Sequence, residues 1–341
     1  MKVNIFDVAK KSGLSVVTVS RVLNQSTTVR AKNRDKVLQA MKDLNYQPNA
    51  AARSLALGRT GIIGLTVTTL DDTFLDLVVK EINDRLTEQG YFLAISVYSP
   101  EEEATHNPLF QEDRVDGLLL LSPIHEEVYV RELELKNIPY IMLDNQLVNP
   151  SVPSVTVNNR KGGYDATRHL IDLGHRQIAH ISGPDLFLSS RERELGYRMA
   201  LEEFGLEPFC VEQGDFTVAS GYAIASEWLR SGHLPTAVFA ADDHIALGVI
   251  NALHYGGVRV PQDISVIGFD DQLIASQLHP RLTTIRQPAE KIGRLGVELL
   301  LNWILESTRP ETAPPHQFDP ELIIRESTAR LNGQDQLLGA E

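Results

Sequence analysis

The sequence predicts a small all-α helix-turn-helix domain followed by an α/β domain of two lobes. Residues 4–24 show helical periodicity that is interrupted by a glycine corner. At Gly61 the periodicity changes from helical to β, and alternating β and α segments then run through two successive sets. With 341 residues, of which 43% are hydrophobic, the chain is long enough to build two or more packed cores.

Residues 4–24 predict two short helices that meet at a tight corner. Ile5, Val8 and Ala9 recur at the spacing of one helix face. Gly13 suits the corner because glycine adopts positive φ without steric cost, and Ser15 suits the N-cap of the second helix. This is the layout of a helix-turn-helix.

The second helix has an unusual outward face. At 100° per residue, Val19, Val22 and Leu23 turn toward the domain. The outward positions are then Val16, Val17, Ser20, Arg21 and Asn24. Outward valines can press on thymine methyl groups in a major groove, while an arginine reaches a guanine edge. The polar candidates for phosphate contacts are Asn4, Ser15, Thr18, Ser20 and Asn24. Because residues 16–19 are all β-branched, a strand or a core position is the alternative.

Charge is distributed unevenly along the chain. Residues 1–60 contain eleven Lys and Arg against three acidic residues, a net charge of +8. The whole chain carries −13, so the remainder carries −21. Positive charge concentrated in one segment is typical of a nucleic-acid-binding module, although a solvated lysine-rich helix face is the plainer alternative. Its coincidence with the helix pair favours DNA.

The same segment carries a family signature. The runs Ile5-Phe6-Asp7-Val8-Ala9, Gly13-Leu14-Ser15 and Thr18-Val19-Ser20-Arg21-Val22-Leu23-Asn24 resemble the N-terminal signature of the lactose repressor/galactose repressor (LacI/GalR) family of bacterial transcription regulators. About a dozen positions agree in register, and the resemblance continues over nearly the whole chain. It implies a transcriptional repressor that binds double-stranded, pseudo-palindromic operator DNA and is not an enzyme.

The first sixty residues divide into a domain and a linker. Residues 31–44 predict a third helix, with Val37, Leu38, Met41 and Leu44 closing a three-helix core, so the helix-turn-helix domain spans 1–48. Residues 49–60 are Ala-rich and too few for a stable isolated helix, and an inert spacer is the alternative. In the resembling family this segment is a hinge helix whose paired copies wedge a leucine into the minor groove. The resemblance therefore adds these DNA contacts: Asn49, Ala52, Arg53 and Leu55.

Residues 61–330 predict the two-lobed effector and dimerisation domain, which looks like the periplasmic-binding-protein fold. The expected lobes are an N-lobe over about 61–158 and 289–318, and a C-lobe over about 159–288 and 319–330, with a tail over 331–341. Residues 310–320 are expected to form a Pro-bearing surface loop. The tail lacks the C-terminal coiled coil by which the lactose repressor forms tetramers, so a homodimer is expected.

The expected ligand site lies between the lobes, because open parallel sheets bind ligands at the carboxyl ends of their strands. The candidates are Thr68, Asp144, Asp242 and Asp270 at strand ends, with Phe74, Arg193, Phe216 and Gln287 in loops or helix starts. Carboxylates accept paired hydrogen bonds from adjacent hydroxyls, a guanidinium donates a fork, and an aromatic face covers the C–H side of a pyranose. We therefore expect a mono- or disaccharide effector and disfavour an anionic one.

Three motifs support this set by resemblance: Arg193-Glu-Leu-Gly196-Tyr197, Asp243-His-Ile-Ala246-Leu-Gly248 and Gly268-Phe269-Asp270-Asp271. Asp242 departs from the family pattern, since many relatives have asparagine there. The plainer alternative for each aspartate is a helix N-cap, and it is favoured for Asp243 and Asp271. For Arg193 the alternative is an internal ion pair.

The remaining composition bounds the function class. Cys210 is the single cysteine, so no intramolecular disulfide can form and a reducing compartment fits. No apolar leader and no run of 18 apolar residues is found, which predicts a cytoplasmic protein, at the nucleoid when DNA-bound, with no membrane partner. His244 and His279 lack the spacing of a metal site and no Gly-x-Gly-x-x-Gly follows a strand, so neither metal nor cofactor is expected.

Two rival functions remain open. A sugar-modifying hydrolase could use Asp144 and Asp270 as an acid/base pair, although a DNA-binding head on an enzyme would be unusual. A solute-capture protein for a transporter is opposed by the same head and by the expected lack of a signal segment.

Overall fold

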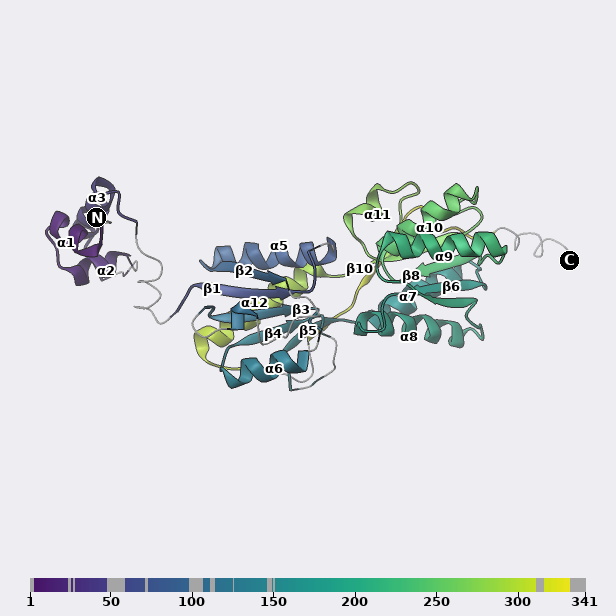
Figure 1. Cartoon of the computed structure of the whole chain (residues 1–341), viewed down its shortest axis with the longest axis horizontal. Helices are drawn as coiled ribbons and strands as arrows, with labels where there is room; N and C mark the ends of the chain where they lie inside the picture. Colours follow the sequence, from purple (N-terminus) through teal and green to yellow (C-terminus); the bar gives the residue numbers. More distant parts are fainter. Residues whose placement is uncertain are drawn as a thin grey trace. The chain divides into compact units, whose positions relative to one another are not determined.

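The chain folds as two units, residues 1–61 and 62–341, whose helices and strands are drawn in Figure 1. Each unit has its own hydrophobic core. The structure is a computed structural model. It describes residues 3–23, 26, 28–47, 59–70, 73–97, 107–110, 114–124, 126–145, 149, 151–310 and 316–331.

The first unit contains the helix-turn-helix that the sequence predicts. Its helices are α1 (Ile5–Ser12), α2 (Val16–Leu23) and α3 (Ala31–Asp43). Asn4 caps α1 and forms a reciprocal capping box with Asp7. Gly13 ends α1 at φ 68°, and Oγ of Ser15 accepts the backbone N–H of Thr18 at 3.2 Å. Local capping chemistry therefore sets the corner between α1 and α2.

The core of this unit differs from the prediction at two positions. Val8, Val19 and Val37 are fully buried at its centre. Leu38, expected inside, is 50% exposed, because it lies 100° around the helix from Val37. Val16, expected to face outward, is half-buried and packs against the core.

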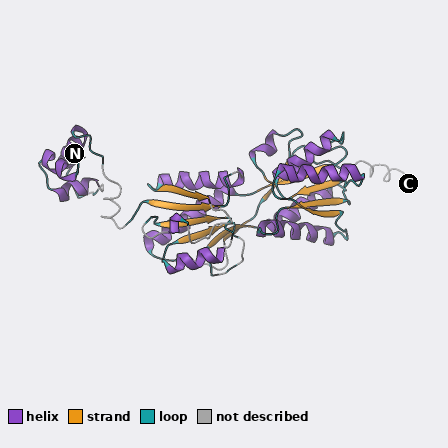
Figure 2. Cartoon of the chain, in the orientation of Figure 1, coloured by secondary structure: helices purple, strands orange, loops and turns teal. Residues whose placement is uncertain are grey.

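The second unit contains two six-stranded sheets with helices on both faces (Figure 2). The first sheet has the order β11-β5-β4-β3-β1-β2, and every pair in it is parallel. Its elements are β1 (Ile62–Val67), β2 (Phe92–Val97), β3 (Gly117–Leu121), β4 (Tyr140–Leu143), β5 (Ser154–Val157) and β11 (His316–Phe318), with α5 (Thr73–Glu88), α6 (Glu126–Leu135), α12 (Ala289–Glu306) and a 3-10 turn at Pro108–Phe110.

The second sheet repeats the plan in the order β12-β10-β9-β8-β6-β7. Its pairs are parallel except for β12, which runs antiparallel to β10. Its elements are β6 (Ile178–Ser182), β7 (Cys210–Gln213), β8 (Ala237–Ala240), β9 (Ser265–Asp270), β10 (Thr283–Arg286) and β12 (Glu321–Ile323), with α7 (Asn159–Asp172), α8 (Leu188–Glu203), α9 (Val218–Ser231), α10 (Asp243–Tyr255) and α11 (Leu273–Gln277).

Alternating side chains of the buried strands build a core on each face of the first sheet. Leu119 and Leu121 of β3 pack with α5 and α12, whereas Leu118 and Leu120 pack with α6. Because both faces are covered, the strands are continuously apolar, as expected for parallel sheets. The second sheet is likewise covered by α9 and α10 on one face and by α7 and α8 on the other.

The chain passes between the two sheets after β5, β10 and β11. Two of these crossovers are tied together, since Nδ2 of Asn158 donates to Oδ1 of Asp319 at 3.0 Å. The prediction of a plain loop over residues 310–320 is wrong at β11. That strand forms by pairing with β5, a long-range contact that local sequence does not display. Within the described part of the chain, no helix is both long and apolar enough to cross a bilayer.

Candidate functional site

A cavity of about 320 Å³ lies where strands of both sheets end. The structure brings together in its lining all eight residues predicted as ligand contacts: Thr68, Phe74, Asp144, Arg193, Phe216, Asp242, Asp270 and Gln287. It adds residues that sequence reasoning did not select: Thr69, Leu75, Ser122, Pro184, Phe187, Ser189, Asp215, Thr217 and His244. Ser122 directly follows β3, so the strand-end argument could have found it. The aromatic Phe187 comes from a loop that only the tertiary fold positions.

Arg193 is held on every side by the protein. From α8, its buried guanidinium donates through Nε to Asn159 at 2.9 Å and through Nη1 to the carbonyl of Ala241 at 2.6 Å. Nη2 lies 3.2 Å from Oδ1 of Asp270, and the guanidinium lies 3.7 Å from the ring centroid of Phe269. Arg193 therefore both forms the internal ion pair with Asp270 and lines the cavity.

Asp270 ends β9 with a backbone φ of 103°. Besides Arg193, the amide of Gln287 donates to its Oδ1 at 2.6 Å, and the amide of Gln272 reaches its Oδ2 at 3.4 Å. Three elements thus fix one carboxylate. The amide oxygen of Gln287 is buried and has no hydrogen-bond partner among the described residues.

Asp144 follows β4 and sits in a desolvated environment. Burial raises the pKa of its carboxyl, while a 2.8 Å hydrogen bond from Ser122 and the charge of Arg193 act in the opposite direction. A ligand that donates a further hydrogen bond to this carboxylate would therefore stabilise its charged form.

Asp242 both caps a helix and lines the cavity. Its Oδ1 accepts the backbone N–H of Ile245 at 2.8 Å at the start of α10, and its Oδ2 lies 3.7 Å from Nδ1 of His244. The caps expected at Asp243 and Asp271 are both wrong, because the N-cap of α10 is Asp242 and that of α11 is Gln272. Asp243 is instead buried, where its carboxylate accepts the hydroxyl of Thr284 at 2.6 Å, and burial raises its pKa.

Aromatic rings form one wall of the cavity. Phe216 and Phe187 lie 5.8 Å apart at an interplanar angle of 55°. A Cβ at Gly183 would lie 2.2 Å from Cζ of Phe216, so the ring occupies space that only glycine leaves open. This wall can cover an apolar face of a ligand.

Strained backbone collects at the same place. Ser122, Asp144, Phe216 and Asp270 all have positive φ, which is uncommon outside glycine. Such residues persist where surrounding structure over-determines them, and they cluster at functional sites. Among the residues that the structure describes in the second unit, this cavity is therefore the best-supported candidate for a binding site.

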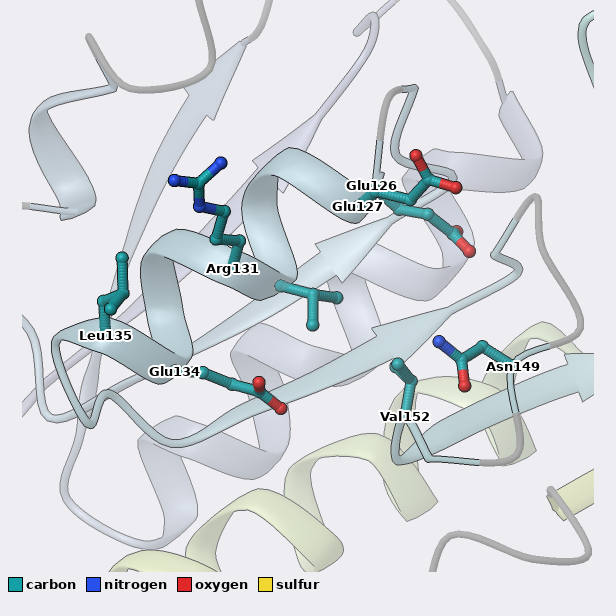
Figure 3. Close-up of a pocket in the computed structure, with 8 residues that line it drawn as sticks. Glu126, Glu127, Arg131, Glu134, Leu135, Asn149 and Val152 are labelled. Carbon is teal, nitrogen blue, oxygen red and sulfur yellow. The ribbon is translucent and has the colours of Figure 1, made fainter.

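A second hollow, of about 490 Å³, lies along α6 (Figure 3). Glu126 and Glu127 stand at one end, while Arg131 points away from Glu134. Its charged side chains do not converge, and it contains none of the predicted site residues. No group of three or more His, Cys, Asp or Glu among the described residues could hold a metal ion.

In the first unit, α2 presents part of the predicted DNA face. Val17 is 61% exposed and Arg21 is exposed, whereas Val16, Thr18 and Ser20 are half-buried. The side-chain oxygens of Asn4 and Ser15 cap α1 and α2. The other predicted contacts, Asn24, Asn49, Ala52, Arg53 and Leu55, lie outside the described residues.

Comparison with known proteins agrees with both units. Residues 4–49 match the family described as bacterial regulatory proteins, lacI family, and residues 167–328 match a periplasmic binding protein-like domain. The chain is 36% identical over 332 residues to the HTH-type transcriptional repressor PurR of Histophilus somni, which covers 96% of this chain and 99% of that protein. This chain belongs to the lacI family. The resemblance inferred from the sequence is confirmed.

Other transcriptional regulators match over similar lengths. The HTH-type transcriptional regulator DegA of Bacillus subtilis is 33% identical over 341 residues, covering 97% of this chain and all of that protein. The lac repressor dimer bound to operator and the anti-inducer ONPF matches with a TM-score of 0.85 and 32% identity, over 96% of this chain and all of that one. The transcriptional regulator CelR–cellobiose complex matches with a TM-score of 0.72 and 32% identity over the same shares. The predicted fold class is confirmed.

Proposed function

We propose that this lacI-family chain is a sequence-specific repressor, acting as a homodimer, whose operator affinity is set by a mono- or disaccharide in the cavity. The lining of the cavity supports a saccharide effector, because it combines carboxylates, a guanidinium and an aromatic wall around a volume of about 320 Å³. That size lies at the lower end of the range for small-molecule sites.

The chemistry of the lining suits a sugar. Asp144, Asp242 and Asp270 offer acceptors to adjacent hydroxyls, and Phe216 offers a ring to a C–H face. Two related structures support this choice, the CelR–cellobiose complex and a LacI family regulator from Enterococcus faecium with bound ribose, the latter 26% identical with a TM-score of 0.72 over 80% of this chain and all of that one.

The first unit suits DNA. Residues 1–60 carry a net charge of +8, which favours binding to the phosphate backbone of DNA. On α2, Val17 is available for a thymine methyl group and Arg21 for a guanine edge. Asn4, Ser15, Thr18 and Ser20 are proposed to position the helix through phosphates, together with Asn24.

Exposed apolar side chains support a homodimer. In the first lobe they lie on α5 and the edge strand β2, as Leu77, Ile95 and Val97. In the second lobe Tyr222 and Tyr255 meet edge to face at 6.4 Å, and Tyr255 is 80% exposed. Large exposed apolar side chains gathered in this way mark association surfaces, and a two-fold pair of heads would read a pseudo-palindromic operator.

Control of DNA binding follows from the two-lobed site. A ligand held by both lobes is proposed to shift the dimer between a state of high operator affinity and one of low operator affinity. It does so only through its different affinities for the two states.

The test uses the full chain. Selection from a random DNA pool gives the preferred sequence, and fluorescence anisotropy then measures its dissociation constant with and without each member of a saccharide panel. We expect a two-fold symmetric sequence whose affinity one saccharide changes. If a nucleobase or nucleoside changes the affinity and no saccharide does, the saccharide effector is overturned and the proposal of a DNA-binding regulator stands. Equal affinity for all DNA sequences would overturn the regulator itself.

A further inference from the structure

The cavity is rich in negative charge. Four carboxylates line it, those of Asp144, Asp215, Asp242 and Asp270, and among the described lining residues Arg193 is the one permanent cation. Counted at formal charges with His244 neutral, the lining has a net charge of −3. The guanidinium already lies 3.2 Å from Asp270, so its charge is largely committed within the protein.

Asp242 is one of these four lining residues, and its carboxylate can only accept hydrogen bonds from a ligand. Oδ1 is committed to the N-cap of α10, at 2.8 Å from the nitrogen of Ile245. Oδ2 has His244 as its ion-pair neighbour, at 3.7 Å, which is longer than a hydrogen bond. An asparagine here could cap the helix equally well and would turn a donor toward the ligand. The aspartate instead requires a donor from the ligand.

Gln287 adds a second, independent demand for a donor. Its side chain is 5% exposed, and its amide nitrogen is committed to Asp270 at 2.6 Å. Its amide oxygen has no hydrogen-bond partner among the described residues. A buried acceptor left unpaired costs about 1–3 kcal/mol, so a ligand donor at this point is favoured.

We infer that the cavity selects a saccharide that carries a protonated amine, and that the carboxylate of Asp242 is the residue that selects it. This inference rests on the proposed saccharide effector. A hydroxyl both donates and accepts, whereas an ammonium donates three hydrogen bonds and accepts none. The ammonium also reduces the repulsion among the carboxylates, and hydrogen bonds between charged partners are about twice as strong as neutral ones. An added phosphate or carboxylate on the ligand would increase that repulsion.

The test is calorimetric titration of the full chain near neutral pH with matched sugars. D-glucosamine, D-galactosamine and D-mannosamine are compared with D-glucose, D-galactose and D-mannose, and the β-1,4-linked disaccharide of glucosamine with cellobiose. In the pair that binds most tightly, we expect the amine to bind at least tenfold more tightly, which is about 1.4 kcal/mol. N-acetylation removes the gain, and the 6-phosphate of the same sugar does not bind.

Asp242→Asn tests the assignment to one residue, because the asparagine keeps the helix cap and removes the charge. The ratio of amine to hydroxyl affinity falls toward one in this variant and is unchanged in Asp172→Asn, an exposed aspartate of α7. A neutral sugar that binds as tightly as its amino counterpart and still changes operator affinity would overturn this inference and leave the proposed function. If no sugar of either kind binds, both this inference and the proposed saccharide effector are overturned. An unchanged ratio in Asp242→Asn would overturn the role of Asp242.

Discussion

Nη2 of Arg193 and Oδ1 of Asp270 lie 3.2 Å apart, and both side chains are more than nine-tenths buried. The pair joins α8 to the carboxyl end of β9 inside the cavity wall. Gln287, in a crossover between the sheets, donates to the same carboxylate. A ligand that touches this carboxylate therefore touches a group that a crossover also holds, so we expect occupancy of the cavity to affect the relative position of the lobes.

Removal of Arg193 should cost both stability and ligand response. Arg193→Ala leaves the carboxylate of Asp270 buried without its cation, and breaking such a pair costs about 3–5 kcal/mol. We expect a lower urea midpoint and an operator affinity that no longer responds to the saccharide, with DNA binding retained. Arg198→Ala, which removes an exposed pair with Glu194 on the same helix, should cost less than about 1 kcal/mol. An unchanged ligand response in Arg193→Ala would exclude Arg193 from the binding site.

Gly196 of the Arg-x-x-Gly motif is predicted to act through packing. A Cβ there would lie 2.0 Å from the carbonyl oxygen of Arg160 and 2.6 Å from the nitrogen of Tyr164, because α7 and α8 approach closely at this point. Gly196→Ala should therefore destabilise the second unit by about 1–3 kcal/mol in urea unfolding. Glu202→Ala, at an exposed position of α8, is the control. Equal stability of the two variants would show that the helices separate without cost.

His180 should make stability depend on pH. The ring is fully buried and stacks against Tyr197 and Phe239, Nδ1 is 2.9 Å from the carbonyl of Phe239, and Nε2 has no partner among the described residues. Burial lowers the pKa of His180 from 6.5 to about 4. The unfolded chain binds this proton first as pH falls, so the contribution is complete above pH 6.5 and is lost toward pH 4. It amounts to about 3 kcal/mol.

Unfolding in urea at a series of pH values between 7 and 4 checks this effect. His180→Phe should flatten the dependence, because phenylalanine fills the space beside Tyr197 and Phe239 and does not titrate. His254→Gln, at an exposed position, should keep the wild-type slope. The same slope in wild type and His180→Phe would assign the acid sensitivity to other groups.

Arg21 should determine base preference rather than general affinity. Loss of a guanine contact in Arg21→Ala is expected to reduce discrimination at one base pair of each half-site by about 1–3 kcal/mol. Lys42→Ala, an exposed lysine of α3, should leave base preference intact. Anisotropy titrations with single-base operator variants distinguish the two. A uniform loss of affinity in Arg21→Ala would reassign Arg21 to a phosphate.

Leu55 is predicted, by resemblance, to wedge between base steps. Leu55→Ala should weaken operator binding and leave the affinity for the saccharide unchanged, because the wedge contacts DNA alone. Operator titration and calorimetry on the same preparation measure both quantities. Equal operator affinity in wild type and Leu55→Ala would show that Leu55 does not wedge between base steps.

Much of the fold follows from local patterns in the sequence. The change from helical to β periodicity expected at Gly61 is followed at once by β1 (Ile62–Val67), because a continuously apolar run marks the strand. The sequence predicts a loop where β11 lies, because three residues near prolines become a strand only through pairing with β5. The sequence predicts Leu38 in the core because it is apolar and adjoins the core residue Val37, whereas its side chain is exposed in the structure.

The site was predictable to the extent that strand ends determine it. The eight predicted residues lie together because parallel strands of two sheets end at one cavity. The commitment of Arg193 to Asn159 and Ala241 could not be predicted, since these partners are 34 and 48 positions away. His244, considered for a metal and set aside, lines the cavity because Asp242 caps the helix that carries it.

The most direct test of the central claim is the dissociation constant of the full chain for its selected two-fold symmetric DNA, measured over a salt series with and without the saccharide that binds the cavity. The account predicts an affinity that falls steeply with salt, exceeds that for scrambled DNA and changes when the sugar is added. An affinity that is the same for scrambled DNA, or that no cavity-bound sugar alters, would contradict it.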